Sequence, residues 1–287
     1  MSRVHIVTDS SVQFCTPGFA EKHTFTLVPL TIQLGQQAYR EDSDLTTEQL
    51  FQRVAAGAPL PVVVAPTAEQ FAATYSELSR RTDQILSIHI SGKLNAAVRH
   101  AQASSATIKG RCRIEVIDSL SISAGLGALV EIAVLAAESG ASLEETVRLV
   151  RSAVPRLYAI FFVESLSYLA HAGRANPAQA LLASMLNVKP FLTLEEGDLA
   201  PMEKTRSRPQ ALEKVVEFVT EFTDIQHLAI LRGVAGQPAD AQQVCERLEA
   251  AYPNRAWPVL TYGPSLAALL GPDALGVMVC EDEVEPE

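Results

Sequence analysis

Hydrophobic positions in the first half of the chain alternate between short strand-like runs and longer helix-like patterns. Runs of aliphatic residues predict strands at residues 4–7, 61–65, 84–89 and 114–117. Helical periodicity predicts helices at residues 46–56, 69–81, 94–106, 124–138 and 146–153. Capping boxes open two of these helices, Thr46 with Gln49 and Ser142 with Glu145. Strands that alternate with helices of this length indicate right-handed crossovers and a parallel sheet flanked by helices.

The second half of the chain repeats this style. Strands are expected at residues 157–162, 188–194, 227–231, 258–261 and 276–279. Helices are expected at residues 164–171, 177–185, 209–222 and 238–250. Pro155 interrupts the helical pattern between the two halves. We therefore predict two α/β domains, an N-terminal one over residues 1–153 and a C-terminal one over residues 154–287.

Length and charge narrow the classes of function. The chain has 287 residues, of which 48% are hydrophobic and 20% charged, so it can bury the cores of two compact domains. Its formal net charge of -10 disfavours nucleic acid and anionic lipid headgroups as partners. We expect no transmembrane helix and no stable membrane insertion, since long uncharged apolar stretches are missing. The first residues lack the apolar core of a signal peptide, which predicts a cytoplasmic protein.

Motifs for metal, cofactor or covalent chemistry are missing from the sequence. The four cysteines form no CxxC pair, and the six histidines lack metal-ligand spacing, so free thiols and no metal are expected. Neither a GxxxxGK[ST] phosphate loop nor a GxSxG nucleophile elbow occurs. We assign no catalytic residue and no cofactor.

Small polar residues follow four of the predicted strands. They are found in TDSS at residues 8–11, PT at 66–67, SG at 91–92 and DS at 118–119. The carboxyl ends of strands in an open α/β sheet border the ligand crevice, where hydroxyls and helix N-termini can hold an anion. The structural alternative is that Thr67 and Ser91 only cap the helices that follow them.

Several longer segments carry a resemblance to a known family. They are VHIVTDSS at the N-terminus, VPLTIQLGQQAYRED at residues 28–42, ISGKLNAA at 90–97, VIDSLSISAGLG at 116–127, the run at 165–212 and GPDALGV at 271–277. In order and spacing these segments resemble the DegV family, whose members are similar to fatty-acid-binding proteins. Some members present the bound fatty acid to a separate kinase, which makes an acyl phosphate.

The resemblance implies a long-chain fatty acid, such as palmitate or stearate, bound between the two domains. Its carboxylate would contact Thr67, Ser91, Gly92 and Lys93, and Arg174 would contact the headgroup or a partner. The structural alternative for Arg174 is an ion pair with an acidic residue, and for Lys93 it is a solvated position. Leucine and phenylalanine side chains would line the acyl chain, with Leu126, Leu129, Phe161, Phe162, Leu182 and Leu186 as candidates. A fatty acid kinase subunit is the implied protein partner.

Three positions depart from the family pattern. Lys93 stands where the family has Thr, Leu269 stands where it has His, and the loop around Thr67 is shortened. The last two changes favour fatty-acid binding over the kinase-coupled step. That step requires the headgroup to be held in a more specific geometry than simple binding does. The alternative function is a phosphoryl- or acyl-transfer enzyme on a related α/β scaffold. A nucleotide loop or an activated nucleophile would distinguish that enzyme, and the sequence shows neither.

Overall fold

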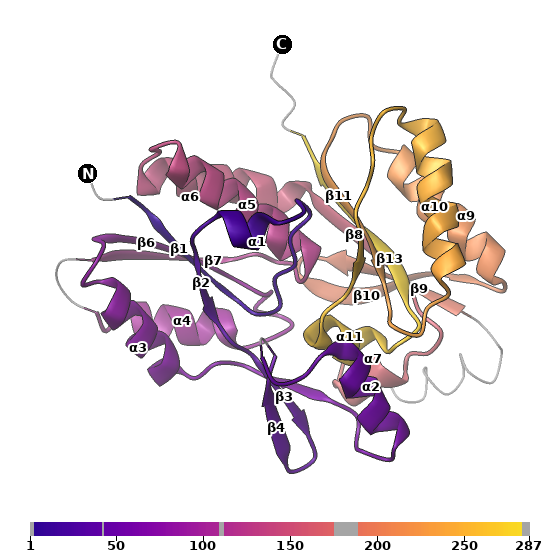
Figure 1. Cartoon of the computed structure of the whole chain (residues 1–287), viewed down its shortest axis with the longest axis horizontal. Coiled ribbons are helices and arrows are strands. Elements are labelled where there is room, and N and C mark those ends of the chain that lie inside the picture. The colour runs from indigo at the N-terminus through magenta and orange to yellow at the C-terminus, as the bar shows by residue number, and fades with distance from the viewer. Residues whose placement is uncertain (1–2, 42, 109–111, 175–188, 283–287) are drawn as a thin grey trace.

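The computed structural model describes residues 3–41, 43–108, 112–174 and 189–282. A four-stranded parallel sheet organises the N-terminal half. Its strands, in spatial order, are β2 (Thr26–Val28), β1 (His5–Asp9), β6 (Gln84–His89) and β7 (Arg113–Asp118). Helices α3 (Ala68–Leu78) and α4 (Ala97–Ser105) cover one face, and α5 (Ala124–Glu138) and α6 (Leu143–Ala153) cover the other (Figure 1). The predicted parallel sheet flanked by helices is confirmed.

Strand β6 shows how the sequence pattern builds this sandwich. Ile85 joins the core cluster under α3 and α4, whereas Leu86 and Ile88 join the cluster under α5 and α6. Side chains of a strand point alternately to its two faces, so a continuous apolar run suits a sheet covered on both sides.

A small antiparallel sheet extends from the N-terminal half. It has the order β4 (Gln37–Arg40), β3 (Thr31–Leu34) and β5 (Val62–Val64). The strand expected at residues 61–65 therefore exists, but it does not belong to the parallel sheet. Two further helices complete this part of the chain, α1 (Phe19–Lys22) and α2 (Thr47–Ala55). Helix α2 packs against the C-terminal half through α11 (Pro264–Leu270).

A six-stranded mixed sheet organises the C-terminal half. Its spatial order is β10 (Asp198–Thr205), β9 (Lys189–Glu195), β8 (Leu157–Phe162), β13 (Leu275–Glu281), β11 (Ile225–Arg232) and β12 (Val259–Thr261). Only β11 and β12 pair in parallel. Helices α9 (Arg208–Thr220) and α10 (Pro238–Ala251) cover one face, and the short helix α7 (Ser167–His171) packs against α11. A 3-10 turn, η1 (Val154–Arg156), connects α6 to β8.

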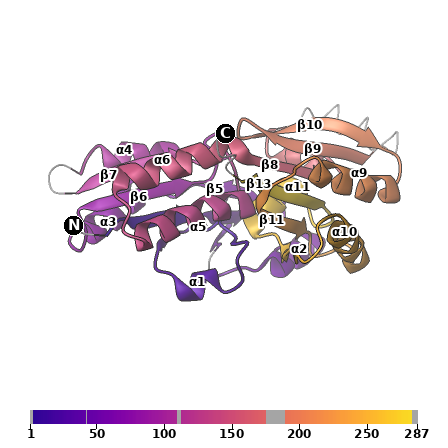
Figure 2. The same ribbon diagram turned by 90° about the horizontal axis from the view of Figure 1, so that it is seen from above.

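The two halves lie side by side along the long axis of the molecule (Figure 2). One hydrophobic cluster contains residues from both, among them Ile90 and Leu94 from the first half and Phe161 and Leu266 from the second. Glu41 adds a polar link, since its carboxylate accepts hydrogen bonds from the Ser10 hydroxyl and from the backbone N–H of Ser265. The predicted domain boundary at residues 153 and 154 falls where α6 meets η1 and stays a prediction.

Candidate functional site

Ser91 lies in the loop that follows strand β6, and its side chain is fully buried. Its hydroxyl donates a 2.6 Å hydrogen bond to the carbonyl oxygen of Gly197 and accepts one of 3.2 Å from the backbone N–H of Lys93. Helix α4 begins only at Ala97 and has Ala96 as its N-cap. Ser91 therefore does not cap that helix, and the structural alternative for this residue is wrong.

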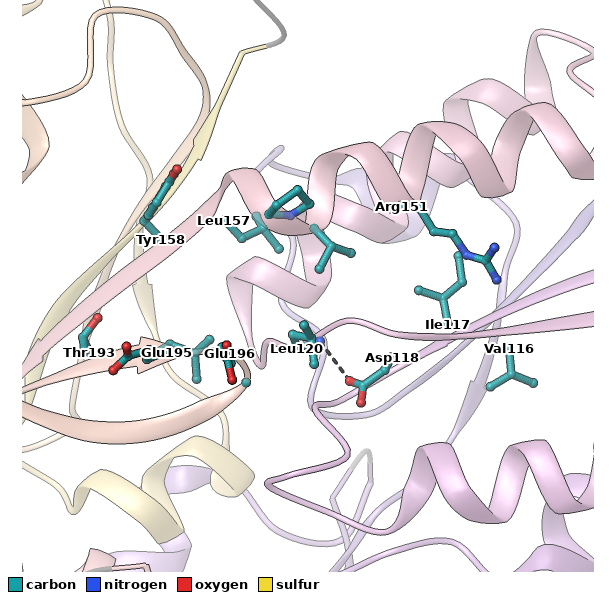
Figure 3. A pocket seen from close by; sticks show the side chains of 14 residues that line it. Val116, Ile117, Asp118, Leu120, Arg151, Leu157, Tyr158, Thr193, Glu195 and Glu196 are labelled. Carbon is teal, nitrogen blue, oxygen red and sulfur yellow. Dashed lines mark hydrogen bonds between the residues drawn. The ribbon is translucent and has the colours of Figure 1, made fainter.

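Gly92 is the neighbour of Ser91 and uses its backbone N–H internally. The N–H lies 3.1 Å from both carboxylate oxygens of Asp118. One of these oxygens, Oδ1, also accepts from the backbone N–H of Leu120 at 2.9 Å (Figure 3). A Cβ at position 92 would lie 2.7 Å from Asp118 Oδ2, so only glycine allows this approach. A carboxylate of the chain itself thus binds the predicted anion donor.

Lys93 and Arg174 each pair with an acidic residue of the β9–β10 hairpin. The Lys93 ammonium lies 3.4 Å from the Glu196 carboxylate, and about half of the Lys93 side chain is exposed. The Arg174 guanidinium binds the Asp198 carboxylate at 3.0 Å and donates to the carbonyl oxygen of Leu94 at 2.8 Å. The ion pair expected as the structural alternative for Arg174 is confirmed, and it brings Arg174 next to the Ser91 loop.

A shallow basic pocket of about 480 Å³ opens beside this loop. Gly92, Lys93 and Arg174 line it together with Arg99 and His100. A chain with a formal net charge of -10 gathers three cationic side chains here, Lys93, Arg99 and Arg174. Such a local excess of cations attracts an anionic group.

Thr67 is exposed and forms the N-cap of α3. Its hydroxyl accepts from the N–H of Gln70, while the Gln70 side chain accepts from the N–H of Thr67. The capping alternative is therefore confirmed for Thr67. The basic pocket reaches Ala65 but is not lined by Thr67, whose predicted contact with a ligand stays a prediction.

The residues proposed to line an acyl chain fall into separate core clusters. Leu126 and Leu129 pack under α5 and α6, and Phe162 packs under α9 and α10. Phe161 belongs to the cluster that joins the two halves and also contains the neighbours of Ser91. Leu182 and Leu186 lie outside the described residues. The described structure does not bring the predicted set together around one cavity.

A larger groove of about 870 Å³ lies on the other side of the hairpin, between β7, the start of β8 and the end of β9 (Figure 3). Its walls are largely apolar and include Ile117 and Leu157. Asp118, Glu195 and Glu196 also line it, with Arg151 as the cation among its lining residues. Three carboxylates repel an anion, so the groove is a poorer place for a carboxylate than the basic pocket.

A buried network of hydrogen-bonded side chains in the N-terminal half was not predicted from the sequence. The hydroxyl of Tyr75 donates to Ser87 at 2.8 Å, Ser87 lies 2.7 Å from His89 Nε2, and His89 Nδ1 lies 3.0 Å from Asp9. All four side chains are fully buried. Ser87 and His89 share one face of β6, and Asp9 ends the neighbouring strand, so the alternation S-x-H could have suggested it.

This order of Ser, His and Asp resembles a hydrolase triad, but it cannot act as one in the described structure. A nucleophile must reach its substrate, and Ser87 is sealed in the core with its oxygen accepting a bond from Tyr75. The backbone N–H of Ile90 also donates to Asp9, at 2.8 Å, so the network fixes the start of the Ser91 loop. Its role is to position that loop.

Within residues 3–282, the described side chains include no cluster of three or more His, Cys, Asp or Glu suited to a metal ion. The described helices include none that is both long and apolar enough to cross a membrane.

Comparison with known proteins supports one family. The model of the DegV family, a family described as uncharacterised, matches residues 3–282. The chain belongs to the DegV family. A DegV domain-containing protein of Streptomyces coelicolor is 33% identical over 282 residues, which cover 97% of this chain and 99% of the relative.

Solved DegV structures share the fold. A fatty-acid-binding DegV family protein from Thermus thermophilus superposes with a TM-score of 0.86 at 29% identity, covering 98% of this chain and all of that one. The fatty acid kinase B3 protein of Streptococcus pneumoniae, loaded with linoleic acid, gives a TM-score of 0.85 at 21% identity. It covers 98% of this chain and 100% of its own. At that identity the second likeness shows the fold alone.

Proposed function

We propose that this chain binds a long-chain fatty acid, such as palmitate or stearate, and presents its carboxylate to a partner fatty acid kinase. One observation carries the proposal. Lys93 and Arg174 are far apart in the sequence, yet both line one basic pocket in an acidic protein, and the loop that carries Lys93 also carries the buried Ser91. We call these three residues the headgroup site. The Thermus thermophilus relative, which binds a fatty acid, supports the choice of ligand.

The headgroup chemistry suits a carboxylate. The Ser91 hydroxyl is a single donor in a fully buried place, and the Arg174 guanidinium offers a planar set of donors. Hydrogen bonds to a charged group contribute about 1.5–3 kcal/mol each, so a few donors offset the desolvation of a buried carboxylate. Gly92 joins this site in our proposal once its N–H is released from Asp118.

The acyl chain is proposed to enter the apolar cluster that joins the two halves. Ile90 and Leu94 flank the headgroup loop and pack in the same cluster as Phe161, which makes this apolar region continuous with Ser91. Burying about 14 methylenes at about 0.8 kcal/mol each provides on the order of 11 kcal/mol before entropy losses. The ligand would then lie between an N-terminal domain of residues 1–153 and a C-terminal domain of residues 154–287.

We infer a carrier that performs no catalysis itself. The sealed Ser87 and the scattered titratable groups of the described residues supply no reachable nucleophile with a base. Leu269, which replaces the family's His, is buried in α11 and adds only apolar surface. Transfer of a phosphoryl group would therefore depend on the partner kinase. Four free cysteines suit a reducing compartment, which supports a cytoplasmic location.

The direct test is to identify the cargo. Protein purified from its host is denatured and extracted with organic solvent, and the extract is analysed by mass spectrometry. We expect a stoichiometric C14–C18 fatty acid, and delipidated protein should bind added palmitate in a calorimetric titration. An extract without lipid, together with no uptake of palmitate, would overturn the proposal. A bound nucleotide or phosphorylated small molecule would instead favour a transferase.

A further inference from the structure

Three consecutive residues at the turn between β9 and β10 bind the three residues of the headgroup site. The Glu196 carboxylate pairs with Lys93 at 3.4 Å, the Gly197 carbonyl oxygen accepts from Ser91 at 2.6 Å, and the Asp198 carboxylate pairs with Arg174 at 3.0 Å. We call Glu196, Gly197 and Asp198 the hairpin tip. Its acceptor groups thus bind the Ser91 hydroxyl and the Lys93 and Arg174 cations, the same groups that would bind a fatty-acid carboxylate.

The backbone of the hairpin tip is shaped for this contact. Glu196 and Gly197 both have positive φ angles, 46° and 86°, as a two-residue hairpin turn requires. A Cβ at Gly197 would lie 2.4 Å from the Ser91 hydroxyl oxygen and 3.1 Å from Leu120 Cδ2. Position 197 must therefore be glycine for two reasons, its turn conformation and its close approach to Ser91.

Glu196 is the unexpected residue of the turn. Glycine, asparagine and aspartate are the residues that tolerate a left-handed conformation, and glutamate gains nothing from it. Its side chain is 85% exposed, so burial does not explain it either. The contact that distinguishes it is the ion pair with Lys93, which directs a carboxylate toward the headgroup site.

We propose that the hairpin tip is an internal competitor for the headgroup site, which it occupies in the free protein and vacates when a fatty-acid carboxylate arrives. This inference rests on the proposed function. A serine hydroxyl has one proton to donate, so Ser91 cannot donate to Gly197 and to a ligand at once. Lys93 and Arg174 would likewise exchange the carboxylates of Glu196 and Asp198 for that of the ligand. The tip keeps the buried Ser91 donor satisfied until then.

The exchange is feasible because the two ion pairs are partly solvated. The Glu196 and Asp198 side chains are 85% and 48% exposed, and exposed pairs are weak and screened by salt. Removing both should raise the affinity for a fatty acid by about three- to tenfold, since each exposed pair corresponds to roughly a two- to threefold factor and the two factors multiply. The gain should shrink as the salt concentration rises.

The test compares a tip variant with a charge-matched control. Glu196→Asn/Asp198→Asn removes both carboxylates, while asparagine tolerates the left-handed turn at position 196. Glu195→Gln/Glu203→Gln removes the same charge from the same hairpin. Among the described residues the Glu195 side chain makes no ion pair, and Glu203 pairs with Lys214, away from the tip. Delipidated samples of each protein are titrated with palmitate, and association rates are measured by stopped flow.

We expect the tip variant to bind palmitate about three- to tenfold more tightly and faster than wild type, and the control to match wild type. If the tip variant binds like the control, or more weakly, the tip does not compete and this inference fails while fatty-acid binding stands. If neither wild type nor the tip variant binds palmitate, the proposed function fails and the inference fails with it. Circular dichroism of each variant verifies that the fold is intact.

Discussion

The buried hydroxyl of Ser91 donates its hydrogen bond to the carbonyl oxygen of Gly197, which lies 106 residues further along the chain. This contact joins the loop after β6 to the β9–β10 hairpin and so connects the two halves of the molecule. It also means that the Ser91 hydroxyl, the central donor proposed for the ligand, already has an acceptor within the protein. The consequences can be tested at single residues.

Ser91→Ala should weaken palmitate binding by about tenfold. A hydrogen bond to a carboxylate is worth about 1.5–3 kcal/mol, but the free protein also loses the weaker bond to Gly197, so the net effect is the smaller end of that range. Calorimetric titration of delipidated protein measures the change. Unchanged affinity in a folded variant would show that the carboxylate binds elsewhere.

Substitutions at Thr67 can separate its two assigned roles. Thr67→Val removes the N-cap of α3 and should lower the free energy of unfolding by about 1 kcal/mol, measured by urea denaturation. Thr67→Asn keeps a capping side chain and should unfold like wild type. If Thr67→Asn nevertheless loses affinity for palmitate, the hydroxyl contacts the ligand. If it binds normally, Thr67 serves only as a cap.

Most of the longer helices could be predicted closely from the sequence because their signals are local. Helices α1 and α11 and the short strands β2, β3 and β4 were not predicted. Thr46 with Gln49 and Ser142 with Glu145 form the capping boxes that the sequence indicates, and the predicted bounds of α5 and β8 agree with the structure. Strand β10 was missed because it carries Pro201 and mostly exposed polar residues. It lies at the edge of its sheet, where proline is tolerated.

The pairing of strands and the headgroup contacts could not be predicted in the same way. The valines of β5 indicate a strand, but nothing near them specifies its antiparallel partner β3, which lies about 30 residues earlier. Likewise, Ser91 and Arg174 are visible as candidate ligand residues, whereas their partners in the hairpin tip depend on tertiary packing. The sequence indicated candidate residues and left open what they contact.

Lys93→Thr should weaken binding of palmitate about two- to fivefold and leave binding of methyl palmitate nearly unchanged. An ammonium beside a carboxylate favours the charged ligand, and the effect is modest because Lys93 is about half exposed. Titrations of both ligands against both proteins provide the comparison. Equal losses for acid and ester, or no loss at all, would show that Lys93 does not interact with the carboxylate.

Glu41 should make stability depend on pH. Burial raises the pKa of the Glu41 carboxyl above its ordinary value of 4.5, although hydrogen bonds from Ser265 and Ser10 oppose the shift. A raised carboxyl pKa means that the folded state holds the proton more tightly than the unfolded state. Its contribution to stability is therefore complete below pH 4.5 and is lost as the pH rises through the folded-state pKa.

Glu41→Gln removes this titration, so the wild type should lose stability relative to that variant as the pH rises from about 4.5 toward neutral, by at most about 1.4 kcal/mol per pH unit. Urea denaturation of both proteins across that range measures the difference. Glu48→Gln is the matched control, because it removes the same charge from an exposed position on α2 and should give a difference that does not change with pH. A constant difference for Glu41→Gln as well would mean that Glu41 is ionised in the folded protein throughout, and that the hydrogen bonds from Ser10 and Ser265 outweigh the effect of burial.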